Sequence, residues 1–223
     1  MLFRSFFNKE EGVKKIYTET GAGQWGSSLA FAGQMFGIDI EVFMVKVSFD
    51  QKPYRKLMMQ SFGAKCHPSP SSLTDFGKKL LDENPNNPGS LGIAISDAIE
   101  TVVKSGGKAK YSLGSVLGHV LMHQTINGNE AILQMEQAGD YPDIIVGCTG
   151  GGSNLSGLMF PFLGQQLRGG QKIDIIGCEP LSCPSFTKGK YAYDHGDMAK
   201  MTPLIKMHTL GSDFLPPANH SGG

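Results

Sequence analysis

The sequence feature that most constrains the fold is a glycine-rich loop at residues 147–154, which read Gly-Cys-Thr-Gly-Gly-Gly-Ser-Asn. The apolar run Asp143 to Val146 comes directly before it, and the helix-like run Leu155 to Phe160 follows it. A strand, a glycine loop and a helix in this order let backbone N–H groups and the positive end of a helix dipole converge on an anion. Three consecutive glycines exceed what a turn requires, so the loop predicts a phosphate site rather than the alternative, a tight turn that binds nothing. The residues expected to form this site are Gly150, Gly151, Gly152, Ser153 and Asn154.

Apolar residues elsewhere alternate between strand-like and helix-like spacing. The spacing predicts strands at 14–18, 40–45, 143–146 and 174–176, and helices at 24–36, 54–62, 71–81, 91–103 and 119–138. Strands separated by helices predict an α/β fold with parallel sheets covered by helices. After Glu179 the periodicity fades, and no further element is predicted.

Composition excludes several classes of protein. The 223 residues suffice for one large α/β domain or two small ones, and the 20 basic and 20 acidic residues balance. Nothing in this balance indicates a nucleic-acid partner or an acidic membrane surface, and no apolar run approaches the length of a membrane span. The four cysteines form no CxxC pair, and no HExxH motif is present. His119 and His123 are four residues apart on a predicted helix and could bind a metal, but a partly buried helix face explains them more simply, so no metal site is expected. Free, reduced cysteines predict a cytoplasmic protein.

A second glycine loop, at residues 19–26, supports an alternative function. Gly21, Gly23 and Gly26 match the G-x-G-x-x-G pattern of dinucleotide-binding proteins, which predicts a nucleotide-binding oxidoreductase. That fold needs an acidic residue at the end of the second strand, where this chain has Lys46. Glu19 stands at the start of the loop, where a carboxylate would repel a pyrophosphate but could transfer a proton to a small zwitterionic substrate.

Several motifs, in order along the chain, are similar to those of one enzyme family. They are the loop Glu-Thr-Gly-Ala-Gly-Gln-Trp-Gly at 19–26, Gln-Lys-Pro-Tyr-Arg-Lys at 51–56, Gly-Ser-Leu-Gly-Ile-Ala-Ile-Ser at 89–96, Tyr-Ser-Leu-Gly-Ser-Val at 111–116 and Gly-Gly-Gly-Ser-Asn at 150–154. Together they resemble the tryptophan synthase β chain, a pyridoxal-phosphate (PLP) enzyme. Trp25 follows the stand-alone branch of that family, where the commoner branch has histidine.

The resemblance implies a fold, a cofactor and a reaction. The fold would be that of type II PLP enzymes, with two α/β domains and the cofactor between them. The reaction would be a β-replacement that forms L-tryptophan from L-serine and indole. Gly150 to Asn154 would hold the PLP phosphate, and Glu19 would be the general acid and base. The amino-acid substrate would be bound by Thr20, Gly21, Ala22, Gly23, Gln24 and Trp25.

The resemblance also implies a domain division and an assembly. Residues 1–115 would be the remainder of an N-terminal domain, including a mobile segment from about Glu19 to Gly114 that closes over the substrate. Residues 116–223 would be the first part of a C-terminal domain that binds the cofactor phosphate. The full-length protein would be a homodimer, and a tightly bound α chain is not expected.

One departure from the family concerns the lysine that binds the cofactor covalently. In the family this lysine lies in a Gly-Ser-His-Lys-x-Asn motif, which would fall a few residues before Met1, and the family also continues past Gly223. Lys9, Lys14 and Lys15 stand in the helix and strand that follow the motif and are no substitutes. We therefore expect a fragment incomplete at both ends and inactive alone. A non-catalytic pseudoenzyme fragment is a further alternative.

Overall fold

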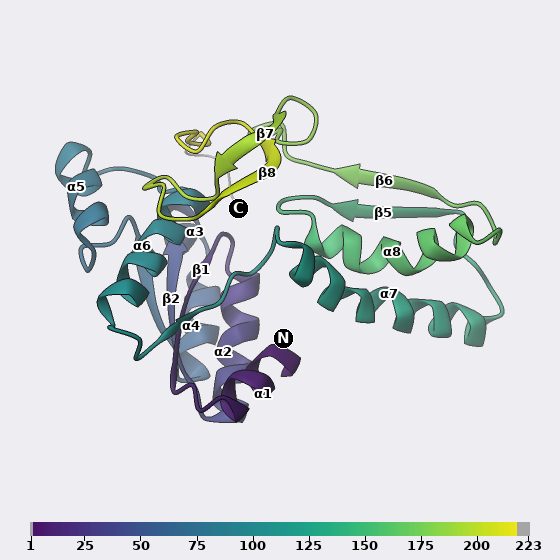
Figure 1. Cartoon of the computed structure of the whole chain (residues 1–223), viewed down its shortest axis with the longest axis horizontal. Helices are drawn as coiled ribbons and strands as arrows, with labels where there is room; N and C mark the ends of the chain where they lie inside the picture. The colour runs from purple at the N-terminus through teal and green to yellow at the C-terminus, as the bar shows by residue number, and fades with distance from the viewer. Residues whose placement is uncertain (1, 218–223) are drawn as a thin grey trace. The chain divides into compact units, whose positions relative to one another are not determined.

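The computed structural model describes residues 2–217 and separates them into two compact units. Unit 1 combines the chain up to Gly114 with the chain from Ser182 onward, and unit 2 is Ser115–Leu181 (Figure 1). The predicted division into 1–115 and 116–223 concerns the domains of the longer family fold, and it stays a prediction. Within residues 2–217, no helix has the length and apolarity needed to cross a membrane.

Unit 1 contains a parallel sheet with the strand order β3-β2-β1-β4. Its strands are β1 (Lys15–Thr20), β2 (Asp39–Val45), β3 (Lys65–Ser69) and β4 (Lys110–Tyr111). Glu19 pairs in register with Phe43 near the carboxyl ends of β1 and β2. Ligands of open α/β sheets bind beyond this end of the strands, which is where the 21–23 loop lies.

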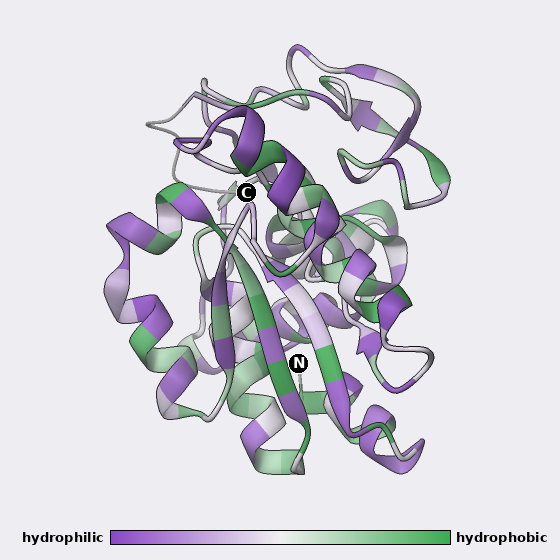
Figure 2. Cartoon of the chain, turned by 90° about the vertical axis from the view of Figure 1, so that its left-hand side faces the viewer, coloured by the Kyte–Doolittle hydropathy of each residue, from purple (hydrophilic) through white to green (hydrophobic). Residues whose placement is uncertain are grey.

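Helices cover both faces of this sheet. They are α1 (Leu2–Glu10), α2 (Gln24–Phe36), α3 (Lys46–Gln51), α4 (Pro53–Ser61), α5 (Asp75–Glu83) and α6 (Leu91–Lys104). On one face, Val42 and Met44 of β2 pack with Leu29 of α2 and Met59 of α4. On the other face, Phe43 of β2 packs with Ala94 and Ala98 of α6. Alternate residues of one strand therefore enter two cores, and Figure 2 shows apolar positions distributed along these strands and the helices beside them.

Unit 2 is a smaller layered structure. The parallel strands β5 (Ile144–Cys148) and β6 (Asp174–Cys178) pack on α8 (Ser153–Leu167), which packs in turn on α7 (Gly118–Ala138). Ile145, Leu155, Phe162 and Ile173 form its buried core. The two units together confirm the predicted α/β class with parallel sheets and covering helices.

The structure corrects the sequence-based prediction in two places. The helix predicted at 71–81 begins only at Asp75, because the Thr74 hydroxyl caps it by accepting the Gly77 N–H (2.9 Å). The stretch after Glu179, for which no element was predicted, forms an antiparallel hairpin of β7 (Lys190–His195) and β8 (Leu204–Thr209). The short elements α3, β3 and β4 were also not predicted, and α1, which contains Lys9, was expected only from the family resemblance.

The hairpin is attached to α6 through its connecting loop. The buried carboxylate of Asp197 accepts hydrogen bonds from the Thr202 N–H (2.9 Å), the Met201 N–H (3.1 Å) and the Ser96 hydroxyl of α6 (2.8 Å). Buried carboxylates require such partners, so this contact fixes the loop on unit 1.

Candidate functional site

The loop between β5 and α8 has the backbone geometry of an anion site. Gly152 caps α8 with a φ of 88°, a left-handed conformation that favours glycine. No side chain caps this helix end, so the N–H groups of its first turn remain directed out of the helix. Ser153 is buried, and its hydroxyl accepts a hydrogen bond from the Ser115 hydroxyl (2.8 Å).

The middle glycine of this loop is required by close packing. A Cβ on Gly151 would lie 2.4 Å from the Ser115 hydroxyl oxygen and 2.6 Å from a methyl carbon of Val116. Val116 itself has a φ of 64°, which a β-branched residue rarely adopts. Strained backbone of this kind gathers at ligand sites. Ser115 and Val116, which the sequence-based site did not include, therefore support the loop.

Gly150 differs from its neighbours because the space around it is open. A Cβ built on Gly150 would meet no heavy atom within 4 Å, and its φ is not in the left-handed region. The loop is thus open at Gly150, and no acidic side chain lies between Thr149 and Asn154 in the sequence. The uncapped N-terminus of α8, the hydroxyls of Ser115 and Ser153 and the open position at Gly150 together suit a phosphate group.

The loop between β1 and α2 in unit 1 repeats this design. Gly23 caps α2 with a φ of 101° and, as in α8, no side chain caps the helix. A Cβ on Gly23 would lie 2.8 Å from the Cβ of Arg55, so the loop also needs glycine for space. The Thr20 hydroxyl accepts the Gly26 N–H (3.2 Å), which ties the strand end to the helix. Backbone N–H groups at this end can bind a carboxylate.

Glu19 lies buried beside this loop, with an exposed fraction of 3%. One carboxyl oxygen accepts the Gly114 N–H (3.2 Å), and the other accepts the Tyr111 hydroxyl. Burial raises the pKa of Glu19 above its ordinary value, while the hydrogen bonds from Tyr111 and Gly114 act in the opposite direction. Burial and the nearby Glu19 charge also raise the pKa of Tyr111. A raised pKa favours the protonated form of a carboxyl group, which is the form that can donate a proton.

Trp25 fixes the segment that covers Glu19. Its indole N–H donates to the Thr18 hydroxyl (2.6 Å), and the Arg4 guanidinium stacks over its ring at 4.4 Å. Arg4 also donates to the Leu113 carbonyl (2.8 Å), and burial lowers its pKa. A Cβ on Gly114 would lie 2.6 Å from the ring of Trp25. Trp25 and Arg4 therefore hold residues 112–114 against β1.

The structure locates every residue predicted for the site. Glu19 and the loop Thr20–Trp25 belong to unit 1, where Ala22 is buried and Gln24 is exposed. Gly150 to Asn154 belong to unit 2, where Asn154 is exposed. The prediction missed Arg4, Tyr111 and Ser115 as supporting residues. Tyr111 and Ser115 lie within the 111–116 motif, which was the available signal, whereas Arg4 gave none.

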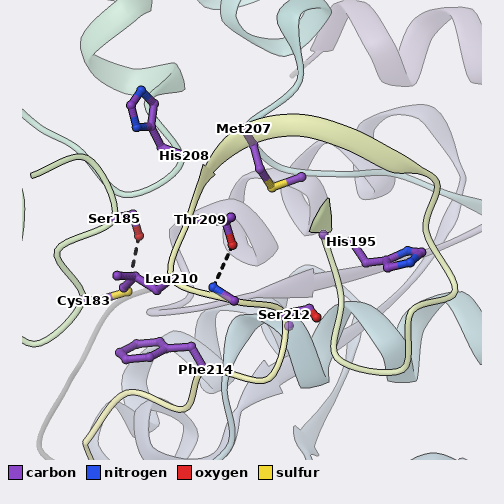
Figure 3. A pocket seen from close by; sticks show the side chains of 12 residues that line it. Cys183, Ser185, His195, Met207, His208, Thr209, Leu210, Ser212 and Phe214 are labelled. Atoms are coloured by element: carbon purple, nitrogen blue, oxygen red, sulfur yellow. Dashed lines mark hydrogen bonds between the residues drawn. The ribbon is translucent and has the colours of Figure 1, made fainter. Parts of the chain in front are cut away.

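A separate cavity of about 170 Å³ lies beside the hairpin in unit 1 (Figure 3). Its lining includes Cys183, His195, His208 and Phe214, and the Gly211 N–H donates to the Thr209 hydroxyl (2.8 Å) at its edge. Among residues 2–217, no three metal-ligating side chains gather in one place, so this cavity has no metal-site geometry.

Comparison with known proteins defines the class of enzyme. The family described as "Pyridoxal-phosphate dependent enzyme" matches residues 2–218, so the chain belongs to that family and its cofactor is pyridoxal phosphate. The G-x-G-x-x-G alternative receives no support from this match.

Curated relatives that match this chain are named as tryptophan synthase beta chains. The chain is 57% identical over 222 residues to tryptophan synthase beta chain 2 of Aeropyrum pernix, covering 100% of this chain and 49% of that protein. It is 58% identical over 220 residues to tryptophan synthase beta chain 2 of Thermotoga maritima, covering 99% of this chain and 52% of that protein. The resemblance to tryptophan synthase β chains is confirmed, and the chain spans about half the length of these relatives.

Solved structures support the fold. A hydrogen sulfide-producing enzyme from Fusobacterium nucleatum matches with a TM-score of 0.58 and 20% identity, covering 86% of this chain and 52% of that one. The processed form of threonine deaminase isoform 2 from Solanum lycopersicum matches with a TM-score of 0.56 and 20% identity, covering 83% of this chain and 47% of that one.

Proposed function

We propose that this chain supplies the phosphate loop, the substrate-carboxylate loop and the acid–base residue of a PLP-dependent enzyme that forms L-tryptophan from L-serine and indole. The observation that carries this proposal is the buried Glu19, with its raised pKa, at the strand end that leads into the 21–23 loop. The names of the relatives supply the substrates.

The proposed cofactor-binding residues are Gly150, Gly151, Gly152, Ser153 and Asn154. The first-turn N–H groups of α8 would bind the phosphate, aided by the buried Ser153 hydroxyl and the dipole of the helix. PLP, when bound, supplies an electron sink that stabilises negative charge at the α-carbon of an amino acid.

The proposed substrate-binding residues are Thr20 to Trp25. The N–H groups at the start of α2 would bind the carboxylate of serine, in the way that other helix ends bind anions. Fixing the carboxylate orients the hydroxymethyl group of serine, which is the part that reacts.

Glu19 would donate and accept protons during the reaction at the β-carbon of serine. The C–O bond at this carbon must break, and the departing hydroxyl needs a proton, which a neutral Glu19 can donate. The carboxylate that remains can accept the proton that indole loses as the new C–C bond forms. Burial of Glu19 keeps bulk water away from this exchange.

We also propose that none of the lysines of residues 1–223 binds the cofactor covalently, so the chain is inactive alone. Unit 2 contains a single lysine, Lys172, which lies in the connection between α8 and β6, away from the loop in sequence. Borohydride reduction of the chain with PLP, followed by peptide mapping, should find no lysine modified selectively. One lysine modified stoichiometrically would refute this part of the proposal.

The assembly, the mobile segment and the cellular location of the full-length protein are also proposals. From the resemblance to the family alone, we propose a homodimer in the full-length protein, a mobile segment from about Glu19 to Gly114, and a cytoplasmic location. A tightly bound α chain is not expected.

A chimeric enzyme tests the reaction. This chain would replace the aligned 52% of the Thermotoga maritima relative, and tryptophan formation from serine and indole would be followed by chromatography. The chimera should form tryptophan, and Glu19→Gln in the same chimera should lower the rate by about 10²–10⁴-fold, as for loss of a general acid. Glu10→Gln, an exposed glutamate of α1, is the matched control and should retain the rate.

The outcomes separate the alternatives. A folded chimera that binds PLP but forms no tryptophan would favour the non-catalytic fragment. A chimera whose Glu19→Gln variant keeps the parental rate would remove Glu19 from the chemistry and leave it a structural residue.

A further inference from the structure

Two cysteines outside the proposed chemistry lie opposite one another in unit 2. Cys148 is the last residue of β5, Cys178 is the last residue of β6, and the two pair in register. The Thr149 N–H donates to the Cys178 carbonyl (2.7 Å), and the Thr149 hydroxyl donates to the same oxygen (3.0 Å). The strands are thus held together at this pair of residues.

Both thiols project from the same face of the sheet. Directly paired residues of neighbouring strands share a face, and successive residues alternate between faces. A Cβ on Gly147 would lie 2.6 Å from a methyl carbon of Leu155 in α8, and one on Gly177 would lie 3.1 Å from the other. Since the residues before the cysteines face α8, the cysteines face away from it. Both are exposed, as are Val146 and Ile176 on the same face.

The spacing of the strands suits a bond between the two sulfurs. Neighbouring strands lie about 4.7–4.9 Å apart. Disulfides join Cα atoms that are about 4.4–6.8 Å apart, but they prefer Cβ atoms closer than the strand spacing. A bond at this position therefore needs only a small local adjustment, and it would be readily reduced, as strained and exposed disulfides are.

We propose that Cys148 and Cys178 form a reversible dithiol–disulfide couple that exchanges with low-molecular-weight disulfides. One cysteine thiolate attacks the small disulfide, forms a mixed disulfide and releases one thiol. The second cysteine then attacks the mixed disulfide, forms the Cys148–Cys178 bond and releases the second thiol. Two protein sulfurs are oxidised, one small disulfide is reduced to two thiols, and the two cysteine protons pass to those thiols. The bond would join β5 to β6 one residue before the 149–152 loop.

The remaining cysteines provide internal controls. Cys66 is buried in the core of unit 1, and burial raises the pKa of its thiol to about 12, which makes it unreactive. Cys183 is half-buried, and its sulfur lies 3.8 Å from the Ser185 hydroxyl. Neither has a cysteine as its partner in a strand pair of the described chain.

Oxidation of the folded chain with oxidised glutathione tests the proposal. Free thiols counted after alkylation should fall from four to two. Peptide mapping should find a link between Cys148 and Cys178 within one chain, and dithiothreitol should reverse it. Cys178→Ser should carry glutathione on Cys148 and form no link, whereas Cys66→Ser should form the link like the parent.

Three results would overturn the proposal. The first is glutathione on both Cys148 and Cys178 without a link. The second is a link between two chains in place of one within a chain. The third is equal selectivity for this pair in urea, which would show that the folded strands do not direct the reaction.

Discussion

At the scale of single residues, the proposed chemistry depends on how Glu19 is held. Tyr111 and Gly114 occupy both carboxyl oxygens, and the segment that carries them is fixed by Trp25 and Arg4. Glu19 therefore has its orientation and its protonation state set by the same contacts. Glu19 should therefore affect the free energy of unfolding as well as the rate of catalysis, because a pKa that is raised by folding makes stability depend on pH.

Removing the Tyr111 hydroxyl should change the titration of Glu19. The hydrogen bond from Tyr111 lowers the pKa of Glu19, so Tyr111→Phe should raise that pKa further. A raised carboxyl pKa contributes stability below its unfolded value, and this stability is lost as the pH rises through the folded pKa. The variant should therefore lose more stability than the parent as the pH rises.

Urea unfolding followed by the fluorescence of Trp25, the single tryptophan, measures this loss, and ¹³C NMR of the Glu19 carboxyl gives the pKa directly. Tyr54→Phe, at a side chain that is 82% exposed, is the control. A Glu19 pKa that falls in Tyr111→Phe would contradict the described hydrogen bond.

At the scale of elements, α6 organises the connection from β3 to α5. The buried Asp97 accepts the Ser69 hydroxyl (2.6 Å), the Ser71 N–H (3.0 Å) and the Thr74 hydroxyl. One turn later, Glu100 accepts the Asp75 and Phe76 N–H groups at the start of α5 (2.7 and 3.0 Å). These two carboxylates replace the hydrogen bonds that a loop and a helix end would otherwise make with water.

Asp97 should make this connection sensitive to pH. Burial raises its pKa from the ordinary 3.8 to about 6, against the hydrogen bonds from Ser69, Thr74 and Ser71. Its stabilising contribution is complete below about pH 3.8 and is lost as the pH rises through about 6, a change of about 3 kcal/mol. Relative to Asp97→Asn, the parent should thus lose unfolding free energy between about pH 4 and 7.

Urea unfolding across this pH range checks the sign, and Asp82→Asn, an exposed position of α5, should run parallel to the parent. A parent that gains unfolding free energy relative to Asp97→Asn as the pH rises would contradict the raised pKa of Asp97.

Two glycines allow α7 and α8 to pack closely. A Cβ on Gly128 of α7 would lie 2.3 Å from the Leu158 carbonyl oxygen, and one on Gly157 of α8 would lie 2.4 Å from the Cβ of Gln124, whereas one on Gly118 of α7 would meet nothing within 4 Å. Gly128→Ala should destabilise unit 2 by about 1–3 kcal/mol, as overpacking does. Gly118→Ala should leave stability unchanged or raise it by up to about 1 kcal/mol. Amide hydrogen exchange of α8 measures both, and equal protection in the two variants would contradict the close packing.

The elements that apolar spacing predicted well are those with a single, continuous core-facing pattern. Helix α2 matches its predicted range, Gln24–Phe36, residue for residue. Strand β3, Lys-Cys-His-Pro-Ser, was missed because its residues are mostly polar and include a proline, and only its neighbour β2 makes it a strand. The β7–β8 hairpin was missed because most of its side chains are exposed, so no burial pattern marks it.

The candidate site also contains residues that the sequence predicted and residues that it missed. The two glycine loops and Glu19 were predictable, because a strand, a glycine loop and a helix leave a local pattern. The supporting contacts join residues far apart in sequence: Tyr111 to Glu19, Ser115 to Ser153, and Arg4 to Trp25. A single sequence does not show which distant residues contact one another. These supporting residues could therefore be predicted only where they lie within a family motif.

At the scale of the whole molecule, each unit has a glycine loop that leads from a strand into an uncapped helix N-terminus, where we propose that an anion binds. Unit 1 presents α2 beside Glu19, and unit 2 presents α8 beside Ser115. Neither helix end is capped by a side chain, which is the feature the two loops share. We assign the phosphate of the cofactor to the α8 end and the substrate carboxylate to the α2 end, and the assignment of the phosphate is the central claim.

The most direct test is PLP binding to the chain followed by amide NMR, with Gly150→Asp compared with Gly150→Asn. A Cβ at Gly150 would meet no heavy atom within 4 Å, and Asp and Asn have nearly the same shape, so the two variants differ chiefly in charge. PLP should shift the amides of residues 150–155. Gly150→Asp should bind about fivefold or more weakly than Gly150→Asn, because a carboxylate close to a phosphate costs about 1–4 kcal/mol. Equal affinities in the two variants, or amide shifts confined to residues outside this loop, would contradict the assignment.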